Sequence, residues 1–167
     1  MAKLTNEELL NKISANFPDK VKSLGEPFGL LTLETEREDI MDLLYFLQTD
    51  PALEFTYLTD LTAIHYPDQE KQTGVIYHLH SLVNNVRVRI KVWLPDDDRH
   101  IHTASVLWNG ANWMERETYD FFGVIFDGHP DLRRILNVDD MTAFPMRKEF
   151  PLEDPNRVDK KDYFFGR

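Results

Sequence analysis

The six histidines are the first candidates for chemistry, because imidazole binds metal ions and exchanges protons near neutral pH. His78 and His80 lie two residues apart in an expected strand, which points both side chains to one face. Cationic residues face them across the expected hairpin and would repel a divalent ion. His100 and His102 lie in an expected loop with no third ligand nearby in sequence. We therefore interpret these histidines as solvent-facing and expect no metal.

A group of carboxylates offers a second candidate, since paired carboxyl groups can serve as general acid and base. Glu115, Glu117 and Asp120 lie close together in an expected helix. However, a helix dipole favours acidic residues in its first turn, and Asp120 is spaced to pair with Arg116. No nucleophile accompanies them, so the structural interpretation is favoured. Neither glycine-rich phosphate-binding motif, G-x-G-x-x-G or G-x-x-x-x-G-K-[ST], occurs in the sequence.

Composition narrows the possible partners. The 167 residues fit one domain, and the net charge of -10 disfavours nucleic acid and anionic lipid. The chain has no cysteine, which excludes disulfides, zinc ribbons and any iron–sulfur cluster held by its own thiolates. No apolar run approaches the ~20 residues that span a bilayer. We expect no nucleic-acid partner and no direct insertion into a membrane.

The N-terminal half is expected to contain two helices that begin with capping boxes. Thr5 and Glu8 begin one helix, and Thr35 and Glu38 begin the other. Residues 28–33 are expected to form a strand between them. In the second helix, the apolar residues at helical spacing are Ile40, Leu43, Leu44 and Leu47.

A strand over residues 55–66 and a hairpin are expected next. Residues 75–83 and 86–94 flank Asn84-Asn85, a two-residue loop suited to a type I′ turn. In that register the core face carries Tyr77, Leu79, Ser81, Val83, Val86, Val88, Ile90 and Val92. The opposite face places His78 opposite Lys91 and His80 opposite Arg89, with Arg87 beside them.

The C-terminal half is expected to begin with a short helix over 103–108. A second helix over 113–122, capped by Asn112 and Glu115, is expected to stop at Gly123 in a left-handed conformation. The prolines that follow indicate an extended arm. The predicted fold class is α+β: a single domain over 1–143, with helices packed on a mostly antiparallel sheet, plus an extended partner-binding arm over 144–167.

Residues 113–152 combine aromatic side chains with arginines, which are favoured at protein contact sites. An aromatic-rich edge of the core is the alternative. Three blocks in this region strongly resemble the signature of the C subunit family of complex I, the NADH:quinone oxidoreductase. The blocks are 111–123, 128–136 and 145–152. Weaker likeness extends over 55–63 and 77–79. Two positions depart from the family: His65 stands where an acidic residue is usual, and Met141 stands where tryptophan is common.

This resemblance implies a non-catalytic structural subunit in the peripheral arm of a proton-translocating NADH:quinone oxidoreductase, with no activity in the isolated chain. It implies a position on the cytoplasmic side of a bacterial inner membrane. The large D subunit of complex I would be its closest partner, near the quinone site, with the B and I subunits also near. No cofactor would be bound by this chain; FMN, iron–sulfur clusters and quinone would lie on partner subunits. The partner-contact residues it implies are Trp113, Glu115, Arg116, Glu117, Asp120, Arg133, Arg134, Phe144, Arg147 and Phe150.

Three alternatives remain open at the level of sequence. Related subunits serve membrane-bound hydrogenases and ferredoxin-linked complexes, and the motifs do not separate these from the NADH-linked enzyme. An independent hydrolase would use the histidines and carboxylates. A free-standing adaptor would need no membrane complex at all.

Overall fold

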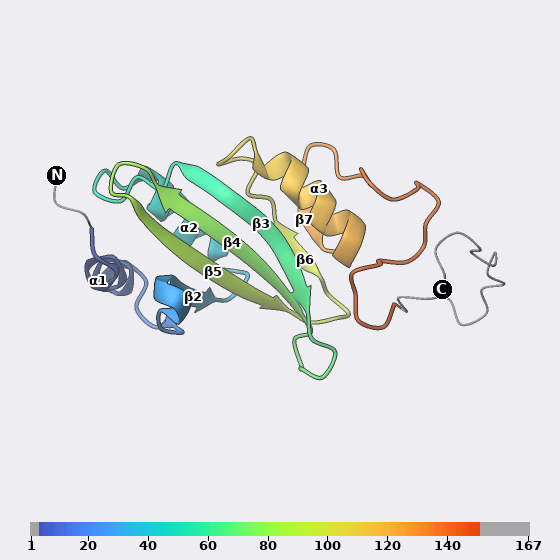
Figure 1. Cartoon of the computed structure of the whole chain (residues 1–167), viewed down its shortest axis with the longest axis horizontal. Helices are drawn as coiled ribbons and strands as arrows, with labels where there is room; N and C mark the ends of the chain where they lie inside the picture. The colour runs from blue at the N-terminus through green and yellow to red at the C-terminus, as the bar shows by residue number, and fades with distance from the viewer. Residues whose placement is uncertain (1–3, 151–167) are drawn as a thin grey trace, which may run out of the picture.

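The computed structural model describes residues 4–150, which form one α+β unit built on a five-stranded sheet (Figure 1). The sheet order is β1-β2-β5-β4-β3, and only the central β2–β5 pair is parallel. The expected α+β fold with a mostly antiparallel sheet is therefore confirmed. The strands of this sheet are β1 (Val21–Ser23), β2 (Leu31–Thr35), β3 (Tyr57–His65), β4 (Thr73–Ser81) and β5 (Val86–Leu94).

Three helices and a small parallel ribbon complete the described fold. Figure 1 shows α3 beside β3 at one end of the molecule and α1 beside β2 at the other. A single apolar core joins the three helices to one face of the sheet, with Ile13, Leu44 and Ala111 packed in the cluster that contains Tyr77 and Ile90. The elements are α1 (Asn6–Asn16), the 3₁₀ turn η1 (Pro27–Gly29), α2 (Ile40–Thr49), β6 (His100–His102), α3 (Ala111–Phe122) and β7 (Ile125–Asp127).

The hairpin between β4 and β5 has the predicted faces but a different register. Ser81 pairs with Val86, so the loop spans residues 82–85, and His78 and His80 now lie opposite Arg89 and Arg87. The shift is by two residues, which preserves the core face, although Val83 leaves it and is exposed. The loop is drawn inward because the Asn84 side-chain amide donates to the carbonyls of Ala52 and Leu53 and to Ser81 Oγ.

Several local predictions are wrong because backbone contacts from distant segments override short sequence signals. The first capping box forms, between Thr5 and Glu8. The second does not, because Thr35 lies in β2 and donates its hydroxyl to the Lys20 carbonyl. The other corrections concern element bounds. Residues 27–29 form η1 and β2 begins later. The short strands β1, β6 and β7 were not predicted. Residues 103–108 form turns, and α3 starts after Gly110 without the Asn112 cap.

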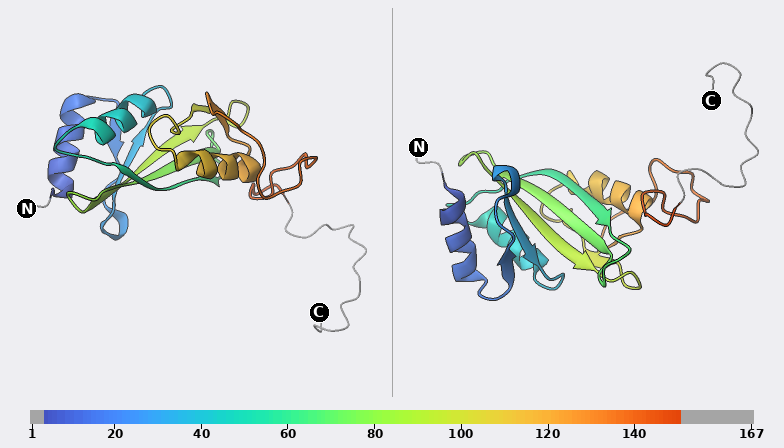
Figure 2. Two further views of the ribbon diagram at one scale, coloured as in Figure 1. Left: turned by 90° about the horizontal axis from the view of Figure 1, so that it is seen from above. Right: turned by 60° about the horizontal axis from the view of Figure 1, so that its bottom comes forward.

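Gly123 ends α3 as predicted, with φ of 77° in the left-handed region. Its missing side chain has a second role, because a Cβ there would come within 2.6 Å of Phe144 Cε2. Glycine thus both turns the chain and lets Phe144 pack against the end of the helix. Figure 2 shows the chain after α3 returning along this end of the molecule.

We expect Gly123→Ala to lower the free energy of unfolding by about 2–4 kcal/mol, because it adds left-handed strain and an overpacked contact. Urea denaturation followed by tryptophan fluorescence measures this change. Gly110→Ala is the matched control, since Gly110 has φ of -64° and open space around its Cβ position. A loss of similar size in both variants would contradict the stated role of Gly123.

Candidate functional site

A buried carboxylate on α3 organises the chain that follows the helix. Asp120 is fully buried. Its Oδ2 accepts the backbone N–H groups of Ile135 at 3.1 Å, Leu136 at 2.8 Å and Asn137 at 2.9 Å. Its Oδ1 accepts Arg134 Nη1 at 2.8 Å and the Asn137 side-chain amide at 2.9 Å. Successive N–H groups around one anion form a backbone nest, so this carboxylate fixes an otherwise irregular segment.

The same contacts keep Asp120 ionised. Burial alone would raise the pKa of the Asp120 carboxyl, but the hydrogen bonds from Asn137, Leu136 and Arg134 hold that pKa well below its ordinary value. The predicted pairing of Asp120 with Arg116 is wrong. Arg134 is the partner, and Arg116 instead stacks over the Trp113 ring at 4.9 Å and donates to the Arg133 carbonyl.

Arg134 extends this anchor into the next segment. Its guanidinium donates to the Asp120 carbonyl at 2.9 Å as well as to the carboxylate, and to the carbonyls of Met141 at 2.7 Å and Ala143 at 3.1 Å. The planar group also lies 5.1 Å from the centroid of the Phe144 ring. The guanidinium thus donates in fork-like fashion to several acceptors, all of them in its own chain.

Residues 144–150 continue along the surface of the same domain. Met146 N donates to the Phe121 carbonyl, and Lys148 N donates to Nδ1 of the buried His65. Arg147 pairs with Asp96 at 2.5 Å and also with Glu149. The first part of the expected arm is therefore attached to β3, α3 and the β5–β6 connection. Residues 151–167 of that arm lie outside the described residues.

A second buried carboxylate lies near the start of α3. Glu115 accepts the Thr103 hydroxyl at 2.5 Å and the Ala104 N–H at 2.6 Å, and His129 Nε2 is 3.8 Å away. Burial raises the pKa of Glu115 to about 7, against the opposing effect of the two hydrogen bonds. The buried Tyr77 hydroxyl, which makes no hydrogen bond among the described residues, has its pKa raised by burial and by Glu115. The site joins α3 to the turns on either side of it.

The predicted partner-contact residues separate into two groups. The buried or half-buried group serves contacts within this chain and comprises Glu115, Arg116, Asp120, Arg134, Phe144 and Arg147. The exposed group, which a partner can reach, comprises Trp113, Glu117, Arg133 and Phe150. Whether either group touches a partner stays a prediction.

An exposed surface lies beside these anchors. Trp113 is 63% exposed, and Leu136 and Val138 are 64% and 67% exposed. With the exposed Arg133, they form what we call the Trp113 surface. A cavity beside Trp113 and Arg133 is also lined by Leu132, Arg134 and Ile135. Exposed aromatic, aliphatic and arginine side chains over buried polar anchors are typical of a surface that docks onto another protein.

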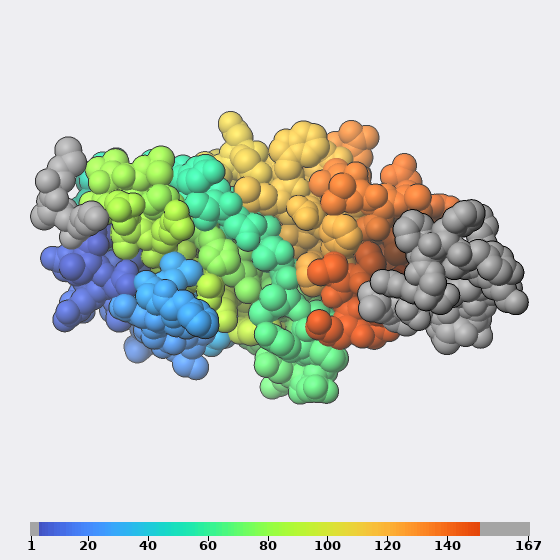
Figure 3. Space-filling view, viewed as in Figure 1, coloured from blue at the N-terminus to red at the C-terminus, as the bar shows by residue number. Residues whose placement is uncertain are grey.

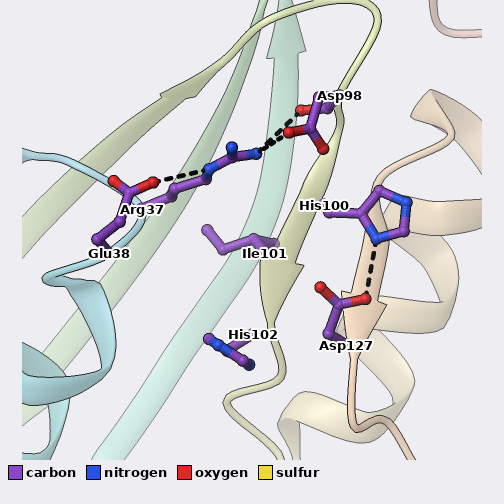
Figure 4. Close-up of a pocket in the computed structure, with 7 residues that line it drawn as sticks. All are labelled: Arg37, Glu38, Asp98, His100, Ile101, His102 and Asp127. Carbon is purple, nitrogen blue, oxygen red and sulfur yellow. Dashed lines mark hydrogen bonds and ion pairs between the residues drawn. The ribbon is translucent and has the colours of Figure 1, made fainter.

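The expected exposure holds for His100 and His102, whereas His78 and His80 are only half-exposed. His65 is buried, and His78 is half-buried, accepting a hydrogen bond from Arg89 Nε at 3.0 Å. Burial and the Arg89 charge lower the pKa of His78. Figure 4 shows the cavity beside β6, where Arg37 points to Asp98 and His100 points to Asp127 at 2.9 Å. Within residues 4–150, no three potential metal ligands come together.

Three residues of the site were missed at the sequence level. Thr103 and His129 surround Glu115, and Asn137 supplies two of the hydrogen bonds to Asp120. His129 lies within one of the blocks that carry the family resemblance, so that block was the available signal. No sequence signal pointed to Thr103 or Asn137, because each contacts a carboxylate that is more than ten residues away in the sequence.

Comparison with known proteins identifies the family of this chain. The family model for the 30 kDa subunit of respiratory-chain NADH dehydrogenase matches residues 33–156. The chain belongs to this family. The C subunit of the NADH-quinone oxidoreductase of Geobacter sulfurreducens is 41% identical over 91% of this chain and 93% of its own length. The corresponding subunit of Roseiflexus is 39% identical over 89% of this chain and 86% of its own length.

Solved structures agree with this assignment. A trypsin-resistant fragment of Nqo5, residues 1–134, shares 32% identity with this chain at a TM-score of 0.63, over 75% of this chain and 98% of the fragment. A chain from the membrane-bound sulfane sulfur reductase, an archaeal respiratory membrane complex, has a TM-score of 0.76 at 22% identity, over 93% of this chain and 96% of its own. The second likeness shows the shared fold. Across the described part of our chain, no helix has the length and apolar character needed to cross a membrane.

We expect Asp120→Asn to lower the free energy of unfolding by about 3–5 kcal/mol, because the Arg134 charge stays buried without its partner and an amide N–H₂ meets backbone donors. Chemical denaturation measures the loss. Asp131→Asn is the matched control, because it also removes an arginine-paired carboxylate, Asp131 with Arg133, at an exposed site. That change should stay within ~0.5 kcal/mol. Equal effects would contradict the anchoring role.

We expect Glu115→Gln to alter how stability depends on pH. A carboxyl whose folded pKa is raised binds more protons in the folded state between its unfolded pKa, about 4.3, and its folded pKa, about 7. Wild-type stability therefore falls as pH rises through that window, and the variant lacks this loss. Relative to wild type, the variant should gain roughly 3 kcal/mol between pH 4.5 and 8.

Denaturation series at several pH values in that window measure the difference between the two chains. Glu117→Gln, at an exposed position on the same helix, is the control and should show no such gain. A constant difference between Glu115→Gln and wild type across the window would show that Glu115 is ionised throughout.

Proposed function

We propose that this chain is a non-catalytic structural subunit in the peripheral arm of a proton-translocating NADH:quinone oxidoreductase. In this proposal it docks onto the D subunit of that complex near the quinone site and the iron–sulfur chain, with the B and I subunits close by. It lies on the cytoplasmic side of a bacterial inner membrane. FMN, iron–sulfur clusters and quinone belong to the partner subunits, and this chain binds none of them.

The observation that carries this proposal is the Trp113 surface, whose cavity is lined by Arg134, the ion-pair partner of the buried Asp120. The oxygens of Asp120 and Glu115 accept hydrogen bonds from their own chain, so these groups are used to hold α3 and the segment after it. In this proposal, residues 111–123 and 128–136 hold Trp113 and Arg133 on an ordered backbone, where a partner can bind them. Relatives over nearly the same length are named as the C subunit of NADH-quinone oxidoreductase, which supplies the class of complex.

The decisive experiment is a mild-detergent affinity purification of the tagged chain from membranes of its own organism. Mass spectrometry identifies the partners, and NADH-dependent quinone reduction is assayed on the same sample. We expect a flavin- and cluster-rich assembly with that activity, in which cross-links join this chain to the D subunit. A cluster-rich assembly without an NADH-oxidising module would overturn the NADH assignment. Recovery of the chain alone would overturn the structural role.

Trp113 provides the variant that separates docking from folding. We expect Trp113→Ala to reduce the affinity of docking by about tenfold or more, as removal of a central aromatic contact does, with the melting temperature of the isolated chain nearly unchanged. Tyr45→Ala is the control, since Tyr45 is a similarly exposed aromatic (60%) on α2. Competition with co-expressed wild-type chain, quantified in the purified assembly, measures the effect. Normal incorporation of Trp113→Ala would remove this surface from the interface.

A further inference from the structure

A second exposed feature lies at the other end of the molecule, in the turn between β1 and β2. Phe28 has a relative exposure of 104%, so its ring touches almost nothing. Its backbone has φ of 59° and ψ of 29°, a left-handed conformation that is strained for a bulky side chain. An aromatic residue here gains no packing within the described chain. The folded chain therefore carries a cost that its own described contacts do not explain.

The turn itself is firmly built. Gly29 N donates to the Glu26 carbonyl at 3.0 Å, and Leu30 N donates to the Pro27 carbonyl at 3.3 Å. Thr32 N then closes the loop on the Gly25 carbonyl at 2.9 Å. These bonds fix the backbone on both sides of Phe28. The exposed ring is thus held on an ordered turn, which is how interfaces limit the entropy lost on binding.

Cationic side chains lie next to this turn, on the sheet face opposite the core. Arg87, Arg89 and Lys91 alternate along β5. Within residues 4–150 none of the three is ion-paired with a carboxylate, and Arg89 contacts only the His78 ring by hydrogen bonding. In a chain of net charge -10, Arg87 and Arg89 are cations without an ion-paired carboxylate in the described residues, whereas Lys91 lies opposite Glu34 across the β2–β5 pair.

A cavity connects the two features. Its lining combines apolar side chains, two asparagines and two arginines: Leu4, Asn6, Pro27, Phe28, Gly29, Leu30, Asn85, Val86, Arg87 and Arg89. In Figure 3 the blue turn stands on the face toward the viewer, below the yellow-green end of the hairpin. We call this region the Phe28 surface. It lies at the opposite end of the molecule from α3 and the Trp113 surface.

We propose that the Phe28 surface is a second docking site, which binds an acidic segment of a neighbouring protein in the assembly. That segment takes the Phe28 ring into an apolar pocket and sets carboxylates against Arg87 and Arg89. Arginine favours such paired, fork-like contacts, and aromatic and arginine residues dominate binding energy at interfaces. This inference rests on the proposed function, because it requires that the chain belong to an assembly.

Charge decides against the other occupants. A two-fold contact between copies of this chain would place the same cations against one another, which is repulsive. Nucleic acid and anionic lipid require a broad cationic surface, whereas the rest of this chain is strongly acidic. A protein segment with carboxylates around an apolar pocket matches both the cations and the ring.

Phe28→Gly gives the sharpest test, because folding and docking should respond in opposite directions. Glycine tolerates the left-handed backbone and loses no packing, so the melting temperature of the isolated chain should rise. Incorporation in competition with wild-type chain should fall about tenfold. Val106→Ala, at a valine that is 70% exposed elsewhere, is the control and should compete equally. Equal incorporation of Phe28→Gly and wild type would overturn the proposed site.

Charge reversal tests whether carboxylates of the partner pair with the arginines of the Phe28 surface. Arg87→Glu should compete poorly, whereas Lys12→Glu, which changes the charge equally at a partly exposed position of α1, should compete as wild type does. A photo-reactive phenylalanine analogue at position 28 then identifies the contact in the purified complex. A cross-linked peptide with clustered Asp or Glu supports the site. A cross-link to a second copy of this chain, a cross-link to lipid, or no cross-link would overturn it.

These outcomes are separable from those of the proposed function. If wild-type chain is absent from every membrane assembly, the proposed function fails. If wild-type chain assembles and Phe28→Gly assembles equally well, only the second docking site fails.

Discussion

The last twenty described residues, 131–150, depend on the carboxylate of Asp120. Residues 131–150 contain no helix or strand, so their backbone donors have no ladder to join. One buried oxygen satisfies three successive N–H groups, and the other holds Arg134, which reaches on to residues 141 and 143. A buried charge is normally costly. Here its full complement of donors offsets that cost and gives an irregular segment one conformation.

This constraint explains why Asp120 and Arg134, two charged residues of the signature region, are hidden from solvent. Asp120 and Arg134 hold the backbone beside the Trp113 surface, and Glu115 holds the start of α3 against Thr103 and Ala104. The oxygens of Asp120 and Glu115 accept hydrogen bonds from their own chain. The exposed residues of that surface, Trp113 and Arg133, are the types that carry binding energy at interfaces. Rigid support under an exposed contact surface is the arrangement that a docking subunit requires.

Local signals predicted those parts of the fold that local physics decides. The Thr5–Glu8 capping box and the Gly123 stop formed as predicted, since each depends on residues within one turn. The alternation of β4 and β5 predicted the core face. It did not predict the register, which the Asn84 side chain sets by reaching back to residues 52 and 53. The family resemblance located the site region, but the partner of Asp120 was missed because Arg134 is brought to it by tertiary structure.

At Phe28 the local sequence signal predicted the wrong structure. The sequence predicts a strand over residues 28–33, which would make Phe28 part of the sheet. The structure instead places Phe28 in a tight turn with a strained backbone and an exposed ring. A folded chain retains such a residue at a cost to its own stability. Within residues 4–150 no contact of the Phe28 ring offsets that cost. A contact with another protein is the compensation that we propose.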